Sequence, residues 1–330
     1  MKTESKIILL LLFLSPALGE LLSGSSPPLE FFTPFGIITL VSFYGGSTLL
    51  IREARARWGL QWSVIFLAIA YGILEEGVVV QSFFSINHVD LGALSGYGMI
   101  GGVQWPWTIN LIVYHATIST LIPIIMVELL WPHYTYVPIL RKRNLVLIGA
   151  AVGIDTVVFM NFVWSLQKNY PVPYVPSPVL LIGSCLVIGL LIWGAYRLRG
   201  SRLCFVSGRL FHPLSLAVLG FLLQAFLLLA AVLASNHVPG SSTIVIQGVV
   251  LAVVGVILVR QLLHQQREAR HLVGFIIGSL VFWILLAPIN EFANKMLGMS
   301  LVGVGAAVLL VYWRRIVLRT EPNNVALKEN

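Results

Sequence analysis

Long apolar runs, each close to the length of a membrane-crossing helix, follow one another along most of the chain. A helix needs about 20 mostly apolar residues to cross the hydrocarbon core of a bilayer. Because backbone groups in lipid must be bonded within their own segment, such runs predict helices. The runs lie at approximately 7–22, 35–51, 61–84, 105–130, 144–166, 178–198, 211–235, 242–262, 271–292 and 296–313. We therefore expect an all-α, polytopic transmembrane helical bundle of about ten spans, which forms a single domain over residues 1–330.

The basic residues test this division independently. With the N-terminus in the cytoplasm, 19 of the 21 Lys and Arg residues fall in inner segments, which leaves only Lys168 and Lys295 outside. Cytoplasmic loops of membrane proteins carry such an excess of positive charge. The pattern predicts that both termini are cytoplasmic, that residues 314–330 form a short cytoplasmic tail, and that the protein is a multi-pass protein of the cell (plasma) membrane.

The first run has an alternative interpretation. Lys2 and Lys6, the apolar stretch after them and the small residues at 17–19 also fit a secretory signal peptide. Cleavage after residue 19 would leave nine spans. The apolar run continues past that position to Leu22, which favours a retained first helix.

Composition places the chain in lipid rather than in water. Apolar residues make up 58% of it and charged residues 10%, whereas a soluble domain carries about 25% charged residues. The lipid bilayer is thus the first expected partner. Nucleic acid is not expected, because the net charge of +8 comes from short clusters between the spans and not from a basic face. The sequence indicates no particular cofactor, and it leaves open whether a metal is bound.

Glycine marks two features of the bundle. The segment 85–104, between the third and fourth spans, is rich in glycine and poor in charge, which indicates a loop that folds back toward the membrane. Gly149 with Gly153, and Gly274 with Gly278, have the small-residue spacing that lets membrane helices approach closely.

Ionisable residues within the spans are the functional candidates, because each is costly in lipid. Glu75 and Glu76 lie in the third span and His115 in the fourth. These spans should be antiparallel neighbours, so a carboxylate can meet His115 inside the bundle. Consecutive helical positions point about 100° apart, so we expect one glutamate to face a cavity and the other to bond a neighbouring helix. A carboxylate that takes a proton from water, assisted by an imidazole, is the catalytic use of such a pair.

Four further polar residues, Asp155, Asn161, Asn290 and Glu291, occupy the fifth and ninth spans. Acids spread over several spans suit a secondary transporter or an ion-coupled carrier. The same residues also fit structural contacts between helices. Three functions therefore stay open at this point: a membrane-embedded hydrolase with its polar site in the outer half of the bilayer, a transporter, and a non-catalytic scaffold.

Two short stretches resemble motifs of the CPBP (CAAX-protease and bacteriocin-processing) family of intramembrane proteases. They are residues 71–77, with the glutamate pair, and residues 111–115, which end at the histidine. Val80 and Leu111 stand where that family has arginine and phenylalanine. The resemblance implies that Glu75 or Glu76 activates water and that His115 assists. For the hydrolase hypothesis, the arrangement of these residues makes a membrane-embedded peptide or a lipid-linked molecule the expected substrate. The general layout also resembles uncharacterised prokaryotic polytopic membrane proteins.

Overall fold

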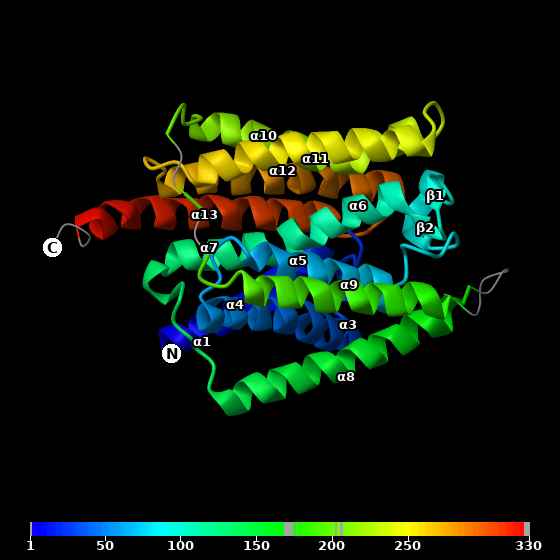
Figure 1. The fold of residues 1–330 in the computed structure, drawn as a ribbon, viewed down its shortest axis with the longest axis horizontal. Helices are drawn as coiled ribbons and strands as arrows, with labels where there is room; N and C mark the ends of the chain where they lie inside the picture. Colours follow the sequence, from blue (N-terminus) through cyan, green and yellow to red (C-terminus); the bar gives the residue numbers. More distant parts are fainter. Residues whose placement is uncertain (1, 168–173, 176, 202, 205–206, 327–330) are drawn as a thin grey trace.

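The computed structural model is a bundle of helices that run roughly side by side along one axis (Figure 1). It describes residues 2–167, 174–175, 177–201, 203–204 and 207–326. The beginning of α1 and the end of α13 lie at the same end of the bundle (Figure 1). An all-α architecture is confirmed, since strand is confined, within the described residues, to one short hairpin.

The elements follow the predicted runs closely. The N-terminal part contains α1 (Thr3–Pro16), η1 (Ala17–Leu21), α2 (Pro28–Phe31), α3 (Pro34–Leu40), η2 (Val41–Gly45), α4 (Gly46–Trp58), α5 (Val64–Ile73), η3 (Leu74–Val79), η4 (Val89–Leu94), β1 (Met99–Ile100), β2 (Val103–Gln104), α6 (Trp105–Tyr114), η5 (His115–Leu121), α7 (Ile122–Leu130) and η6 (Pro132–Tyr134). The C-terminal part contains α8 (Lys142–Gln167), α9 (Pro178–Arg197), α10 (Pro213–Ala234), α11 (Gly240–Leu262), α12 (Ala269–Asn294) and α13 (Met299–Ala326).

Three helical boundaries differ from the prediction. The second run continues to Trp58, and the last continues to Ala326, so most of the predicted tail is helical. The third run ends early, at Val79 rather than at residue 84. It ends because Gln81 has a φ of 62°, in the left-handed region that breaks a helix.

Eight helical stretches in the described part of the chain are long and apolar enough to cross a membrane. They include the composite helix from α3 to α4, the one from α6 to α7, and each helix from α8 to α13. The protein is therefore a multi-pass membrane protein in a lipid environment. Two further predicted spans, α1 with η1 and α5 with η3, are helical but fall outside that group; predicted spans are called passes below. The count of ten membrane spans accordingly stays a prediction.

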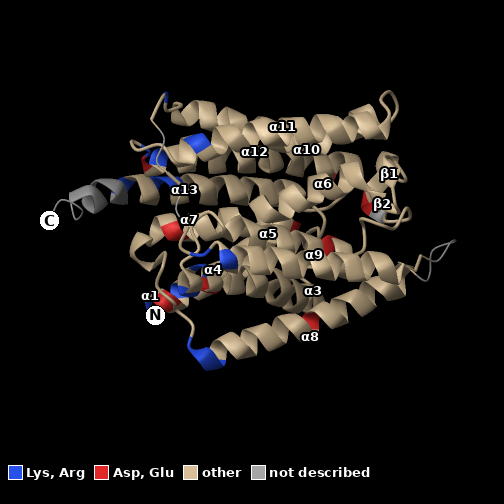
Figure 2. Cartoon of the chain, viewed as in Figure 1, with Lys and Arg blue, Asp and Glu red and all other residues tan. Residues whose placement is uncertain are grey.

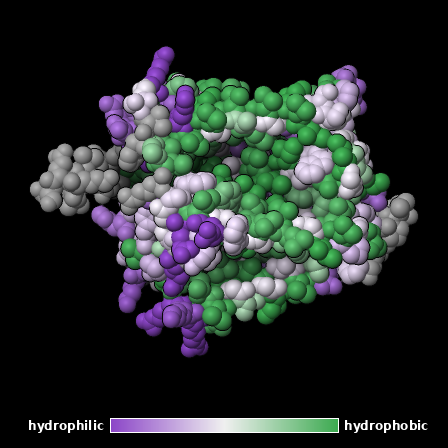
Figure 3. Space-filling view, in the orientation of Figure 1, coloured by the Kyte–Doolittle hydropathy of each residue, from purple (hydrophilic) through white to green (hydrophobic). Residues whose placement is uncertain are grey.

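Charge is distributed unevenly along the bundle axis. Lys and Arg gather at the end of the bundle where α1 begins and α13 ends (Figure 2). We call this end the basic end. The middle of the visible face is mostly hydrophobic (Figure 3). This arrangement agrees with the charge alternation of the sequence, and the assignment of the basic end to the cytoplasm stays a prediction.

A buried ion-pair network fixes part of the basic end. Glu53 of α4 is fully buried and lies 2.7 Å from the Arg52 guanidinium and 3.2 Å from that of Arg57. The backbone N–H of Ile139, in the chain after α7, donates at 2.8 Å to Glu53 Oε1, the oxygen that also contacts Arg52. Arg52, itself 2% exposed, donates to the carbonyl of Tyr134. The network therefore ties α4 to the connection between α7 and α8.

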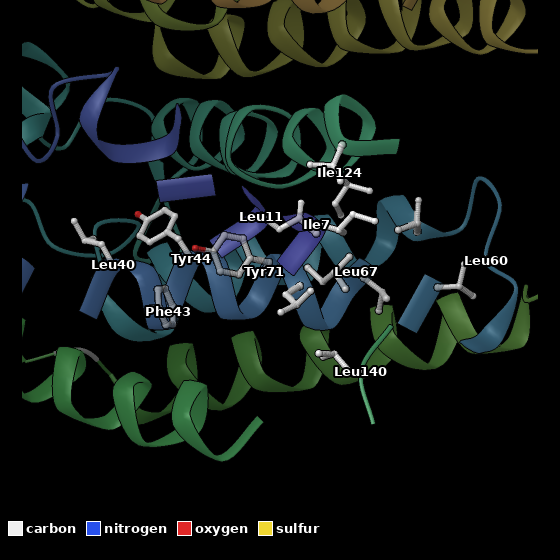
Figure 4. Packing of buried hydrophobic residues seen from close by; sticks show 14 of the residues in the cluster. Ile7, Leu11, Leu40, Phe43, Tyr44, Leu60, Leu67, Tyr71, Ile124 and Leu140 are labelled. Carbon is white, nitrogen blue, oxygen red and sulfur yellow. The ribbon is translucent and has the colours of Figure 1, made fainter. Parts of the chain in front are cut away.

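The first helix is part of the core. Ile7 and Leu11 are buried among residues of α4, α5 and α7 (Figure 4). Pro16 lacks the N–H that would bond the carbonyl of Leu12, one turn earlier. Gly45 of η2 lies against that carbonyl, so closely that a Cβ at this position would overlap it. The backbones of the first two passes are thus in direct contact.

Close helix packing confirms one of the two predicted glycine pairs. Gly274 and Gly278 of α12 lie against backbone carbonyls of α10, where a Cβ would overlap them. For Gly149 and Gly153 the prediction is wrong, because a Cβ at either position would have no heavy atom within 4 Å. These two glycines lie on α8, which is mostly exposed on the outside of the bundle.

Candidate functional site

The two glutamates predicted on the third pass and the histidine predicted on the fourth meet inside the bundle. His115 Nδ1 lies 2.9 Å from Glu75 Oε2, and His115 Nε2 lies 3.0 Å from Glu76 Oε1. All three residues are buried, with exposed fractions of 1% for Glu75, 8% for Glu76 and 2% for His115. We refer to Glu75, Glu76 and His115 as the Glu–His–Glu cluster.

Both glutamates contact the same ring, which differs from the expectation that they would serve different purposes. The expectation assumed that two groups pointing in different directions cannot share a partner. An imidazole has nitrogens on two edges of its ring, so carboxylates that approach from different directions can each reach one. Consecutive positions on one helix therefore hold His115 from both edges.

Gly72 allows the two helices to approach each other at this point. A Cβ on Gly72 would lie 3.3 Å from His115 Cβ and 3.4 Å from Ile112 Cα, tighter than most carbon contacts. Gly72 is one turn before Glu76 on the same pass. Because this position has no side chain, the backbone of α5 can lie close to α6 and η5. The glutamates that follow on the same pass can then contact His115.

Every residue of the cluster lies on a π-helical turn. Glu75 and Glu76 are in η3 and His115 begins η5. Such turns are rare, and they occur frequently at functional sites because an inserted residue redirects the side chains around it. Two more π-helical turns, η1 and η2, belong to the neighbouring passes. The irregular backbone of four passes thus converges on one region.

Pro123 explains how η5 is joined to two other passes. It has no N–H to bond the carbonyl of Ser119, one turn earlier. That carbonyl instead accepts hydrogen bonds from Ser15 Oγ at 2.6 Å and Thr48 Oγ1 at 3.2 Å. Ser119 Oγ lies 3.1 Å from His115 Nδ1. The first and second passes are therefore hydrogen-bonded to the turn that carries the histidine.

The segment 80–104 covers the cluster at the end of the bundle opposite the basic end. Ser82 Oγ donates to Glu76 Oε2 and accepts from Trp107 Nε1 at 3.0 Å. Gln104 Nε2 donates to the carbonyls of Ser82 and Ser85, both at 3.1 Å. The segment thus folds back onto the bundle, as its glycine-rich composition indicated, and holds Ser82 against the carboxylate.

Glu20 and Tyr44 form a second buried polar group beside the cluster. Tyr44 donates to Glu20 Oε1 at 2.5 Å, and Ser26 donates to the other oxygen at 2.7 Å. The Tyr44 ring lies 6.2 Å from the His115 ring and 5.8 Å from the ring of Tyr71 (Figure 4). These residues were not among the candidates. An acid at the end of an apolar helix was a weak signal for Glu20, and no sequence signal indicated Tyr44.

The other four candidate residues lie apart from the cluster, each with its own local contacts. Asp155 of α8 is buried against η2, whereas Asn161 is exposed and donates to the carbonyl one turn earlier at 2.7 Å. Asn290 Nδ2 donates to the carbonyl of Ser23 at 2.9 Å. Glu291 accepts from backbone N–H groups at the start of α13, at 3.3 and 2.6 Å. The contacts of Asn290 and Glu291 are typical of structural residues.

The Glu–His–Glu cluster also offers ligand atoms for a metal. One atom from each residue lies within 4.8 Å of the other two. Imidazole and carboxylate ligands together suit divalent ions such as Zn²⁺, Mn²⁺ or Fe²⁺. The cluster is therefore the place in the described chain where a resident ion would be held.

Comparison with known proteins identifies the family of the chain. A family model described as an uncharacterised membrane protein family matches residues 9–326. No curated protein and no solved structure matches the chain. The likeness to the CPBP family thus rests on residues 71–77 and 111–115 alone.

Proposed function

The chain belongs to the uncharacterised membrane protein family matched over residues 9–326, and on that premise we propose that it is a membrane-embedded hydrolase, acting in the cell membrane. Since the family carries no known activity, the function has to be argued from the site. The observation that carries the proposal is His115 held at both ring nitrogens by buried glutamates from one helical turn.

The arrangement resembles a general acid–base pair with an orienting partner. In such sites one group transfers protons, and a neighbour fixes its orientation through a hydrogen bond. Three ionisable groups inside a membrane bundle are costly, and they mark functional positions by default. The four π-helical turns around the site support the same interpretation.

Exposure suggests a different role for each glutamate. The Glu76 side chain keeps 11% of its surface accessible, and the Glu75 side chain keeps 1%. Water can therefore reach Glu76 more readily. We assign proton transfer to Glu76, and we assign to Glu75 the positioning of the His115 ring through Nδ1.

The proposed step cleaves an amide bond with water. Glu76 takes a proton from the water, and the water oxygen attacks the carbonyl carbon while the carbonyl oxygen gains the electron pair. His115 Nε2 lies 3.0 Å from Glu76 Oε1 in the structure; once Glu76 is protonated, the N–H at Nε2 turns from that carboxyl to the oxyanion and stabilises it. When the carbonyl re-forms, the carbon–nitrogen bond breaks and Glu76 returns its proton to the leaving amine. The products are one carboxylic acid and one amine, and the enzyme is unchanged.

The depth of the site indicates the class of substrate. Glu76 lies within one turn of Val79, the last residue of η3, and therefore about 5 Å from that helical end. This end is opposite the basic end of the bundle. A substrate at this depth is a membrane-embedded peptide or a lipid-linked molecule in the leaflet away from the basic end.

The transport hypothesis receives less support. It depended on acids in several passes, and Glu291 now has a local capping role at the start of α13. Among the residues that the structure describes, no hydrogen bond or ion pair joins Asp155 or Glu291 to the Glu–His–Glu cluster. A scaffold role would not require three ionisable groups to be buried together inside the bundle.

A change at Glu76 tests the proposal. Glu76→Asp keeps the charge but withdraws the carboxylate by about one methylene, and a displacement of about 1 Å lowers a reaction rate about 100-fold. Cells that express the wild type or the variant are compared by quantitative mapping of new protein N-termini in the membrane fraction. Termini produced by the enzyme should appear with the wild type and be strongly reduced with the variant at equal amounts of folded protein.

Glu291→Asp is the matched control, since it makes the same chemical change in an acid outside the site. It should leave the new termini unchanged. His115→Gln should remove them. Identical termini in wild-type, Glu76→Asp and His115→Gln membranes would rule out proteolysis by this cluster.

A further inference from the structure

Two apolar grooves run along α12, one on each side of Ile277 and Val281. The first lies between α10 and α12, has a volume of about 210 Å³ and includes Ala217 in its lining. The second lies between α12 and α13, has a volume of about 320 Å³ and is lined by Ala307 and, at one end, by Arg314. Ile277 and Val281 line both grooves and form a ridge between them.

Both grooves lie in the half of the bundle next to the basic end. Helices α10 and α12 begin there and α13 ends there (Figure 1). Ala217 is about 6 Å along α10 from Pro213, and Ile277 is about 12 Å along α12 from Ala269. Ala307 precedes Arg314 by about 10 Å. The grooves therefore have the depth of the acyl chains of one leaflet.

Arg314 places a positive charge at the mouth of the second groove. Its side chain is exposed, and it has no ion pair with an acidic side chain among those that the structure describes. Figure 2 shows the basic residues gathered at this end of α13. A guanidinium binds phosphate oxygens through two parallel hydrogen bonds. Arg315, the next residue, is equally exposed but does not line the groove.

We propose that the two grooves bind one diacyl phospholipid with an anionic headgroup, taken from the leaflet next to the basic end. One acyl chain lies on each side of the ridge of Ile277 and Val281, and the phosphate lies at Arg314. Basic pockets between membrane helices bind anionic headgroups in this way. The site is separate from the Glu–His–Glu cluster, so it does not depend on the proposed hydrolase activity.

Native mass spectrometry of the purified, delipidated full-length protein tests the proposal. The probes are phosphatidylglycerol and phosphatidylcholine with the same two acyl chains. Because one Arg near the membrane surface favours an anionic lipid by a factor of about five, phosphatidylglycerol should bind about fivefold more tightly. Arg314→Gln should abolish this preference, and the matched control Arg315→Gln should keep it.

Variants that place a large side chain in a groove test the contribution of the acyl chains separately from that of the headgroup. Ala307→Phe should weaken the binding of both lipids, and Val218→Phe, at an exposed position of the first groove, serves as the second variant. Size-exclusion chromatography checks that each variant is folded. The proposal is overturned if Arg315→Gln loses the preference for phosphatidylglycerol as fully as Arg314→Gln does. It is also overturned if both groove variants bind the lipids as tightly as the wild type. Equal affinity for single-chain lysophosphatidylglycerol and the diacyl lipid would overturn it as well.

Discussion

A direct measurement can distinguish whether Glu76 and His115 form an ion pair or a hydrogen bond between neutral groups. The perturbation is a double-mutant cycle of Glu76→Gln, His115→Gln and the combined variant. The measured quantity is the change in the free energy of unfolding, and the coupling is the departure from additivity. A hydrogen bond between neutral groups and a buried ion pair predict couplings of different size.

The structure sets the expected magnitude. The two atoms are 3.0 Å apart, and the side chains are 3% and 11% exposed. Neutral polar contacts between membrane helices are worth about 0.6 kcal/mol on average and at most about 1.7 kcal/mol. Removing one partner of a buried ion pair costs about 3–5 kcal/mol. Each ring nitrogen lies within 3.0 Å of a carboxyl oxygen, and an imidazole that donates from both nitrogens is positively charged, so the cycle is designed to detect an ion pair.

We therefore expect each single variant to lose about 3–5 kcal/mol and the combined variant to be no less stable than either one. Reversible unfolding in mixed micelles, followed by circular dichroism, provides the free energies. Glu76→Gln combined with Asn161→Ala is the control pair, because Asn161 is exposed on a different pass. Changes at Glu76 and His115 that add within about 0.5 kcal/mol would refute the charged pair.

Three further predictions concern the fold. Glu53→Gln leaves a buried arginine without its counter-charge and should lower the free energy of unfolding by about 3–5 kcal/mol. Glu268→Gln, in an ion pair with Arg270 that is about half exposed, should cost about 1 kcal/mol or less in the same unfolding measurement. Gly278→Ala should cost about 1–3 kcal/mol, because its Cβ would overlap a carbonyl of α10. Gly149→Ala, with open space around it, should not destabilise the protein in that assay, and equal effects at the two glycines would contradict the packing argument. Intact-mass measurement of the purified protein should find α1 still attached, since Ile7 and Leu11 are core residues. A mass equal to that of a chain without residues 1–19 would contradict this.

The sequence was sufficient to predict the helices and the meeting of the third and fourth passes. Apolar runs and clustered charges are strong signals in lipid, where a misplaced span costs several kcal/mol. Glu75, Glu76 and His115 were identified because ionisable residues are rare in such runs. Their proximity followed because consecutive spans joined by one connecting segment are expected to be antiparallel neighbours.

The internal geometry of the site could not be predicted in this way. A regular helical period places Glu75 and Glu76 about 100° apart, and it gives no indication of the π-helical turns of η3 and η5. These turns depend on contacts from other passes, such as Ser15 and Thr48 on the carbonyl of Ser119. Glu20 was missed for the same reason, since its partner Tyr44 lies on another helix.

The hydrogen-bond partners of the first helix are synthesised at different times. Ser15 and Thr48, in the first two passes, are 33 residues apart and bond each other at 2.9 Å, and Glu20 finds Tyr44 after 24 residues. The carbonyl of Ser119 is made 104 residues after Ser15, which at ribosomal rates is about 5 to 20 seconds later. During that interval, the first two passes must satisfy each other's polar groups without the rest of the bundle. Ser15 with Thr48 and Glu20 with Tyr44 can therefore bond each other before the helix that carries His115 has been made.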